Sequence, residues 1–265
     1  MGKAKDAELT EHDAWHWLQQ QHPAICTWLE PFSEKGRKRG DKGEFWWELR
    51  ACAYYEVFPQ VKIVYVDIGS NPTFVYDSQG SYCANTAYFV PKGEQFLTGL
   101  LNSNVFWYLI TGKSNAIRGG FYRLFTQHME TIPIPKATYK QKQHIAQLAE
   151  SCQTIAEDRY QTQDRIRRRI PSLCTPDKEA KLSNKLKAWW ELDFTEFQKE
   201  IKSRFKHKMT LDECDEWEGY LATNQQKVQQ WDFQLASKEA ELNKAVYDLF
   251  GLDDEEISLL ENNLK

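Results

Sequence analysis

The pattern of apolar residues changes at Ile132-Pro-Ile-Pro135, and this change constrains the fold more than any other feature of the sequence. Before it, short β-branched and aromatic runs such as Val61-Lys-Ile-Val-Tyr-Val66 stand between turn residues. After it, apolar residues recur at helical spacing. The two prolines remove backbone donors and end any regular element. The sequence therefore predicts an α+β protein, with a small sheet-containing domain over residues 1–136 and a helical domain over residues 137–265.

The first domain should hold a small sheet with helices packed on it. Three runs have the composition of strands, at residues 61–66, 73–76 and 86–90. Residues 94–110 show helical spacing that fits one or two helices, and short helices interrupted at Pro23 should precede the sheet. Residues 33–43 are rich in Lys, Arg and Gly without apolar periodicity, which predicts an exposed, mobile loop.

The second domain should consist of long helices. Residues 141–169 predict one amphipathic helix, and further helices should follow Pro171 and Pro176. The last long helix should end at Gly251, since glycine readily takes the left-handed conformation that terminates helices. We expect this domain to act as a spacer or docking surface.

The charge is distributed unevenly around a net value of −4. Lys plus Arg balance Asp plus Glu at 14 and 14 in residues 1–136, whereas the counts are 20 and 24 in residues 137–265. The acidic excess of the second half thus does not exclude an anionic partner for the first. No apolar run reaches the length of a membrane span and no export signal is evident, so we expect a cytoplasmic protein without a membrane partner.

Motifs for self-contained chemistry are missing. No G-x-G-x-x-G or G-K-[ST] loop occurs, which argues against a nucleotide or methyl-donor enzyme, and we expect no cofactor and no catalytic residue. Asp177 and Glu179 superficially resemble the acids of metal-dependent nucleases, but they follow Pro176 in one short stretch that suits the first turn of a helix. His12 and His16 lack a third ligand, so we expect no metal site. The scattered cysteines fit reduced thiols; they are Cys26, Cys52, Cys83, Cys152, Cys174 and Cys214.

Two segments combine cations with glycines and aromatics. The first runs from Arg37-Lys-Arg-Gly-Asp-Lys-Gly43 into Phe45-Trp-Trp47, and the second is Lys113-Ser-Asn-Ala-Ile-Arg118-Gly-Gly-Phe-Tyr-Arg123. Lys and Arg neutralise phosphates, Arg also reads guanine, and glycine permits close backbone approach. The aromatic residues of the first segment fit a ligand surface or a buried core equally well. Each segment is therefore a candidate nucleic-acid contact.

Read in order, several segments resemble the TaqI-like C-terminal specificity domain of type IIG (Eco57I-like) restriction-modification enzymes. They are Trp46-Trp-Glu-Leu-Arg50, Cys52-Ala-Tyr-Tyr55, Val61-Lys-Ile-Val-Tyr-Val-Asp-Ile68, Leu100-Leu-Asn-Ser103, Arg118-Gly-Gly120 and Ile132-Pro-Ile-Pro135. Further on, Ala245-Val-Tyr-Asp-Leu-Phe-Gly-Leu252 is similar to the closing helix of such proteins. The resemblance covers most of residues 20–260.

The resemblance implies sequence-specific recognition of double-stranded DNA for an adenine methyltransferase or endonuclease. In that family a methyltransferase domain precedes this region and grips a flipped adenine, and its motifs are missing from this sequence. We therefore expect a fragment, split subunit or gene remnant that needs a methyltransferase or endonuclease domain or subunit as its partner. Its DNA contacts should come from Arg37, Lys38, Arg39, Lys42, Lys113, Arg118 and Arg123.

Two other functions remain open. The chain is alternatively an interaction scaffold whose helical half mediates assembly and whose basic loop only confers solubility. A nuclease would need Asp177 and Glu179, and changing either acid would then abolish Mg²⁺-dependent cutting of plasmid DNA.

Overall fold

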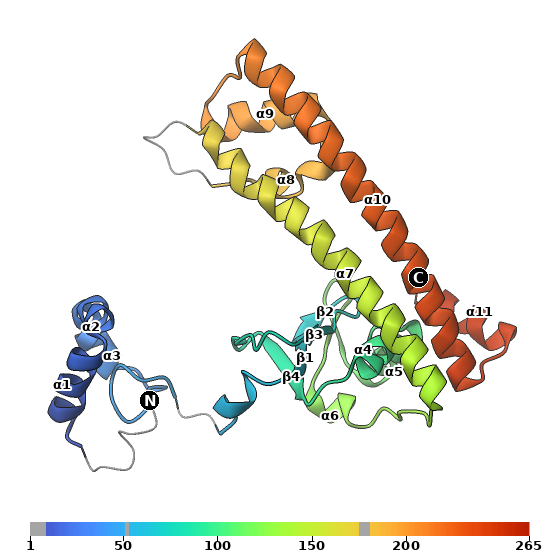
Figure 1. The fold of residues 1–265 in the computed structure, drawn as a ribbon, viewed down its shortest axis with the longest axis horizontal. Helices are drawn as coiled ribbons and strands as arrows, with labels where there is room; N and C mark the ends of the chain where they lie inside the picture. Colours follow the sequence, from blue (N-terminus) through green and yellow to red (C-terminus); the bar gives the residue numbers. More distant parts are fainter. Residues whose placement is uncertain (1–8, 51–52, 175–180, 265) are drawn as a thin grey trace. The chain divides into compact units, whose positions relative to one another are not determined.

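The computed structural model describes residues 9–50, 53–174 and 181–264. It divides into two compact units, Met1–Val57 and Phe58–Lys265 (Figure 1). The predicted α+β fold class is confirmed, because small antiparallel sheets precede a helical region.

Short helices make up most of the first unit. Thr10 caps α1 (Glu11–Gln21) by accepting a hydrogen bond from the Asp13 N–H, and α2 (Pro23–Leu29) begins with the proline at which we predicted the interruption. At this first helical position the missing N–H of proline has no helical partner to lose. The remaining elements of the unit are η2 (Glu30–Phe32), α3 (Ser33–Arg37) and η3 (Tyr55–Val57).

Helix α3 falls in the segment predicted to be a loop, and that part of the prediction is wrong. Gly36 of α3 is buried against Trp46, where an added Cβ would lie 2.6 Å from Cε3 of the indole. Trp46 itself is 4% exposed and lies in a cluster with Trp15 and Trp47. The helical turn of α3 packs on these rings, and such tertiary packing can override the local propensity of a sequence. The tryptophan at position 46 is therefore part of the core.

A three-stranded antiparallel sheet opens the second unit. Its central strand is β1 (Lys62–Val66), with β3 (Val75–Asp77) and β4 (Ala87–Pro91) on either side. Ile63 and Tyr65 of β1 are buried in a core that includes Phe106 and Ile110. All three predicted strands are confirmed within one or two residues.

A second antiparallel sheet in this unit was not predicted. Its order is β2-β6-β5, from β2 (Ile68–Gly69), β6 (Phe121–Arg123) and β5 (Ala116–Ile117). Strands of two or three residues are too short to show alternation in the sequence. The backbone N–H of Leu124 donates to the carbonyl of Asp67 over 2.9 Å, which ties β6 to the end of β1.

Helices from both sides of Pro135 share one core. Residues 94–110 form two helices as predicted, α4 (Gln95–Leu101) and α5 (Asn104–Lys113), followed by α6 (Thr126–Met129). Phe96 and Leu100 of α4 pack with Ile145 and Leu148 of the helix that begins at Tyr139, and with Val246 of the last long helix. The functional boundary expected between residues 136 and 137 stays a prediction, although the core continues across it.

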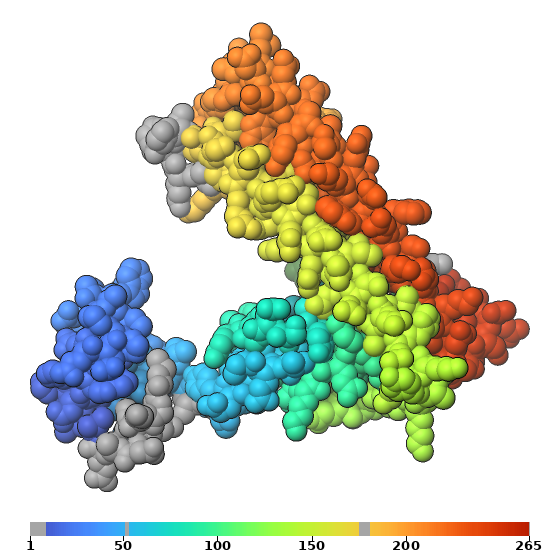
Figure 2. Space-filling model, in the orientation of Figure 1, coloured from blue at the N-terminus to red at the C-terminus, as the bar shows by residue number. Residues whose placement is uncertain are grey.

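Two long helices lie side by side in the second unit, α7 (Tyr139–Arg169) and α10 (Leu211–Phe250) (Figures 1 and 2). Capping boxes at Thr138 and Thr210 start them, and Gly251 ends α10 with φ +70°. The predicted amphipathic helix and its predicted terminator are both confirmed. Helix α11 (Asp254–Asn263) follows.

Shorter helices pack at the far end of this pair. They are η4 (Ile170–Leu173), α8 (Asn184–Lys187), η5 (Trp189–Glu191) and α9 (Phe194–Phe205). Their core contains the fully buried Trp189 and Phe197 together with Trp217 of α10. No helix in the described ranges combines the length and the apolar character needed to cross a membrane.

Candidate nucleic-acid interface

Arg37, the first predicted contact residue, is held by the protein itself. It ends α3, and its Nη2 and Nε donate to Oε1 of Glu11 over 2.8 and 3.2 Å. Its guanidinium carbon lies 5.5 Å from the centre of the Trp46 ring, within the range of a cation–π contact. Its side chain remains half exposed, and only part of its donor capacity faces solvent.

The next three cations of this segment differ in how they are engaged. Arg39 Nε donates to Asp41 over 3.2 Å, and Nη2 approaches the carbonyl of Glu48 at 3.4 Å. Lys42 Nζ donates to the carbonyl of Arg37 over 2.8 Å and so closes the loop. Within the described part of the chain, Lys38 is exposed and its ammonium has no such partner. The segment is therefore more strongly tied to the protein than its composition indicates.

Arg118 stands at the turn of an exposed β-hairpin. Ile117 of β5 pairs with Phe121 of β6, so that Arg118, Gly119 and Gly120 form a three-residue loop between the strands. Arg118 is exposed, and no hydrogen bond or ion pair engages it among the residues that the structure describes. All five N–H donors of its guanidinium are therefore open to a ligand.

The two glycines after Arg118 set the shape of this turn. Gly119 and Gly120 have φ values of +92° and +78°, in the region where residues with a Cβ are strained. Nothing lies within 4 Å of a Cβ built on Gly120, so conformation rather than space requires glycine there. In the structure these glycines turn the hairpin, and that they also let the backbone approach a ligand stays a prediction.

Apolar side chains flank the hairpin loop on the protein surface. Ile117 is 36% exposed and Phe121 is 42% exposed, and Ile68 of the adjoining β2 is also exposed at 42%. An unpaired arginine among exposed apolar groups can combine hydrogen bonding with van der Waals contact on one ligand surface.

Arg123 and Lys113 lie near this hairpin but are partly engaged. Arg123 Nη1 is 3.5 Å from Asp67 Oδ2, and its guanidinium lies 5.2 Å from the Phe125 ring centre. Lys113 ends α5 and donates to both the carbonyl and the hydroxyl of Thr131, over 3.1 and 2.9 Å. Both side chains remain exposed, so they can still meet an anion beside Arg118.

A buried ion pair that the sequence did not reveal supports the first sheet. Lys62 is fully buried, and its Nζ donates to Asp77 Oδ2 and to the carbonyl of Phe58, both over 2.6 Å. Burial alone raises the pKa of Asp77, but the Lys62 ammonium and the N–H groups of Ser81 and Gln79 outweigh it and hold that pKa below its usual range. The position of a lysine within an apolar strand is the sequence signal from which a buried ion pair could have been predicted.

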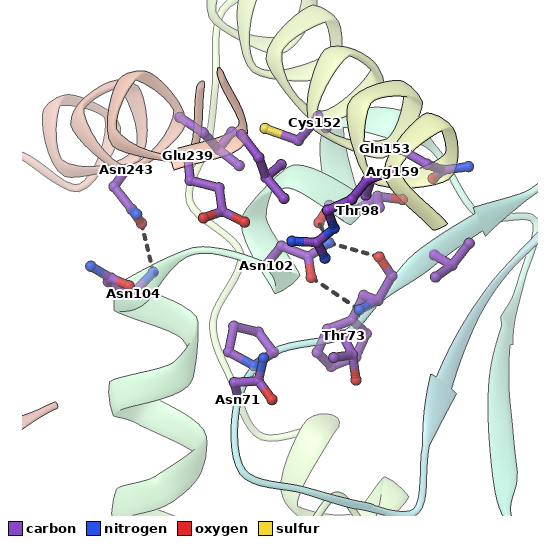
Figure 3. A pocket seen from close by; sticks show the side chains of 17 residues that line it. Asn71, Thr73, Thr98, Asn102, Asn104, Cys152, Gln153, Arg159, Glu239 and Asn243 are labelled. Carbon is purple, nitrogen blue, oxygen red and sulfur yellow. Dashed lines mark hydrogen bonds between the residues drawn. The ribbon is translucent and has the colours of Figure 1, made fainter. Parts of the chain in front are cut away.

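A cavity of about 430 Å³ with both polar and apolar walls lies between residues 71–75, α4, α7 and α10 (Figure 3). Asn102 and Gln153 line it. Each holds the backbone of one residue through two hydrogen bonds. Asn102 binds the N–H and carbonyl of Phe74, and Gln153 binds those of Tyr76. Since β3 is an edge strand, these amides cover backbone groups that would otherwise be open to pairing.

Charged groups from the two long helices also extend into this cavity. Arg159 of α7 and Glu239 of α10 both point inward in Figure 3, and Arg159 Nη1 donates to Asp232 over 2.7 Å. Burial raises the pKa of Glu239, and it raises the pKa of the Cys152 thiol to about 11. A thiol with so high a pKa is a poor nucleophile, so the cavity does not resemble a cysteine active site.

The remaining sequence candidates give no site in the described structure. Asp177 and Glu179 lie outside the described residues, as does Cys52. His12 and His16 are exposed on α1, as expected, and Cys26, Cys83, Cys152 and Cys214 are reduced thiols. Over residues 9–50, 53–174 and 181–264, no three His, Cys, Asp or Glu side chains come together as metal ligands. That the protein needs no metal, cofactor or catalytic residue of its own stays a prediction.

Comparison with protein families gives two matches. Residues 25–134 match the TaqI-like C-terminal specificity domain. The resemblance predicted from the sequence is confirmed over this range. Residues 138–246 match a domain of unknown function (DUF8810), and no curated protein matches the chain. The matched range includes the hairpin of Arg118, and both predicted basic segments lie inside it.

Proposed function

We propose that residues 1–136 recognise a sequence in double-stranded DNA for a methyltransferase or endonuclease domain or subunit. That partner carries out the chemistry, and this chain contributes no catalytic residue. The match of residues 25–134 to a specificity domain of the TaqI-like family supports a DNA specificity role in restriction-modification. The type IIG class, the link to adenine methylation and a cytoplasmic location belong to the same proposal.

The β5–β6 hairpin carries this proposal. A two-stranded ribbon fits the major groove of B-form DNA, and an arginine fork matches the O6 and N7 acceptors of guanine. Arg118 stands at the turn of the β5–β6 hairpin, beyond the residues of β6 that pair with β2, with all its donors open. The exposed Ile117 and Phe121 can contact thymine methyl groups beside it. We assign base reading to Arg118 for these reasons.

The other predicted contacts suit the phosphate backbone. Lys38 is exposed without a protein partner, and Lys113 and Arg123 are exposed beside the hairpin. Arg37, Arg39 and Lys42 would share their remaining donors with DNA while they keep their protein bonds. Phosphate contacts of this kind position a protein on the duplex without reading its sequence.

Selection of duplexes from a randomised pool with the full chain tests the proposal. We expect enrichment of one sequence, and a mobility shift that weakens between low and high salt while the enriched duplex stays preferred. Binding without enrichment would contradict sequence recognition. No binding even at low salt would contradict any direct contact with DNA.

An interaction scaffold is the second candidate function. Exposed apolar side chains favour it, but they lie in the first unit and not in the helical half to which the sequence assigned assembly. Trp28 is 71% exposed on α2, with Ile25 at 49% and Phe32 at 47% near it in the sequence. The Trp28 and Phe32 ring centres lie 6.0 Å apart, so they form one apolar surface. Self-association of the chain that Trp28→Glu abolishes, together with no DNA binding, would support the scaffold instead.

A further inference from the structure

The region between α8 and the start of α10 separates positive from negative charge. Residues 181–208 contain eight Lys or Arg against four Asp or Glu. Residues 211–218 contain five Asp or Glu and no Lys or Arg. The acidic total of residues 137–265 therefore conceals a strongly basic segment inside the domain that was expected to be only a spacer.

The charged side chains of α9 that are exposed are all cationic. Lys199 and Lys202 are exposed, and Lys206 continues their row at the C-cap, at the i, i+3 and i+7 spacing of one helix face. Phe197, Ile201 and Phe205 form the opposite, buried side of the same helix. In the described part of the chain, neither Lys199 nor Lys202 has an ion-pair partner.

The carboxylates of α9 are used for other contacts. Glu196 accepts a hydrogen bond from the Asp193 N–H in a capping box, and the Glu196 N–H donates to Asp193 over 2.7 Å. Glu200 accepts a hydrogen bond from the Ser183 hydroxyl over 2.7 Å. These bonds hold the acids at the sides of the helix, so they do not neutralise the lysine row.

Two arginines fix the neighbouring basic segment, residues 181–187, in place. Arg204 Nε donates to the carbonyl of Lys181, and Arg167 Nε donates to the carbonyl of Lys187, each over 2.7 Å. Arg167 also stacks over Trp190 at 4.9 Å. Lys185 is exposed on the segment between these two anchors, beside α9. The cations are thus presented on a rigid support, which lowers the entropy lost when a ligand binds.

Two of the acids at the start of α10 lie on its far side from the core that it shares with α9. Phe197 of α9 and Trp217 of α10 stack with ring centres 5.5 Å apart in the core that the helices share. Asp212 and Asp215 lie on the side of α10 opposite Trp217, as the helical period requires. These two aspartates therefore point away from the shared core, whereas Glu213 pairs with His207, the residue after the lysine row, over 2.9 Å.

We propose that Lys185, Lys199, Lys202 and Lys206, the cationic face of the α8–α9 region, form a second DNA-binding surface that contacts phosphates without reading bases. The identity of the polyanion as duplex DNA rests on the proposed function of residues 1–136. Lysine acts as a point charge toward phosphate, and rows of lysines add affinity through the release of counterions. The domain of residues 138–246 then contributes affinity, and the specificity domain contributes discrimination.

Anisotropy titrations of the full chain with a labelled duplex of random sequence test this surface. We compare K199Q/K202Q with K227Q/K244Q, which removes the same net charge from two exposed lysines of α10. The first variant should lower the slope of log K against log salt by about 1.8, because each lost phosphate contact removes roughly 0.9. It should also weaken binding several-fold, whereas the α10 variant should change the slope by less than about half of that.

Two results would overturn the proposal. Equal decreases of slope for the two variants would mean that only the net charge affects binding, and unchanged slopes in both would mean that these lysines do not contact phosphates. Circular dichroism and thermal unfolding verify that both variants keep the fold. If K199Q/K202Q unfolds early, the single variants K199Q and K202Q replace it, and each should lower the slope by about 0.9.

The same titrations separate this proposal from that for the specificity domain. Loss of the cationic face should raise the Kd values for the enriched and the scrambled duplex by the same factor, so the ratio of the two Kd values stays constant. If selection enriches no sequence, the specificity proposal fails while the salt slopes on random duplex still report on α9.

Discussion

The segments 37–42 and 113–123 carry the same signal in the sequence, yet within each of them the structure engages some cations and leaves one open. In the first, Arg37, Arg39 and Lys42 bind a carboxylate or carbonyl of the protein and hold a loop against the aromatic core. In the second, Lys113 and Arg123 contact Thr131 and Asp67, whereas a hairpin turn presents Arg118 with no protein partner among the described residues. Composition therefore finds the cations, but the geometry of nearby acceptors decides which of them are open to a ligand.

Lys62 is the extreme case of a cation engaged by the protein, and its loss should have the largest effect. Lys62→Met leaves Asp77 buried without its partner, which typically costs about 3–5 kcal/mol of unfolding free energy. Urea unfolding followed by circular dichroism measures the change. The double variant K62M/D77N should recover part of the loss, because it also removes the unpaired charge. A loss below about 1 kcal/mol for K62M would show that the pair is dispensable.

Arg118 should behave in the opposite way, with an effect on recognition and none on stability. We expect Arg118→Ala to reduce discrimination between the enriched and scrambled duplexes by about 1–3 kcal/mol, since it removes a bidentate base contact. Arg118→Lys keeps the charge but not the fork, and should lose most of the same discrimination. Competition titrations give the ratio of Kd values. A uniform loss on both duplexes would reassign Arg118 to phosphate contact.

Arg37 and Lys38 allow the comparison to be made between neighbours. Arg37→Ala should destabilise the first unit by about 1 kcal/mol, because it removes a partly exposed ion pair and a cation–π contact. Hydrogen exchange of the amides in residues 9–50 measures this locally. Lys38→Ala should leave exchange unchanged and lower the salt slope of DNA binding by about 1. Faster exchange in the Lys38 variant would remove the distinction drawn between these two residues.

The pH dependence of stability should show the smallest effect and only at acid pH. The folded pKa of Asp77 is held below its unfolded value, so its contribution to stability is present above the unfolded pKa and is lost as pH falls through the folded pKa. The wild-type protein should therefore lose more unfolding free energy than Asp77→Asn between about pH 5 and pH 3. Parallel pH profiles for the two proteins would contradict a lowered pKa for Asp77.

Regular elements of normal length could be predicted because each carries its own periodic signal. The strand at Val61-Lys-Ile-Val-Tyr-Val66 and the helix ending at Gly251 are present within a residue or two. The sheet formed by β2, β5 and β6 was missed, because strands of two or three residues depend on long-range partners. Helix α3 was missed for a related reason, because its Gly36 packs on Trp46, a residue ten positions further along the chain.

By itself, the sequence determined the fold class, the long helices, the resemblance of residues 25–134 to the TaqI-like specificity domain and the places where cations cluster along the chain. Only the tertiary structure decided that Arg37 is tied to Glu11, that Arg118 stands open at a turn and that the lysines of α9 share one face. The reason is physical: periodicity and composition are local, whereas the partner of a charge is set by chain segments that folding brings together from distant positions.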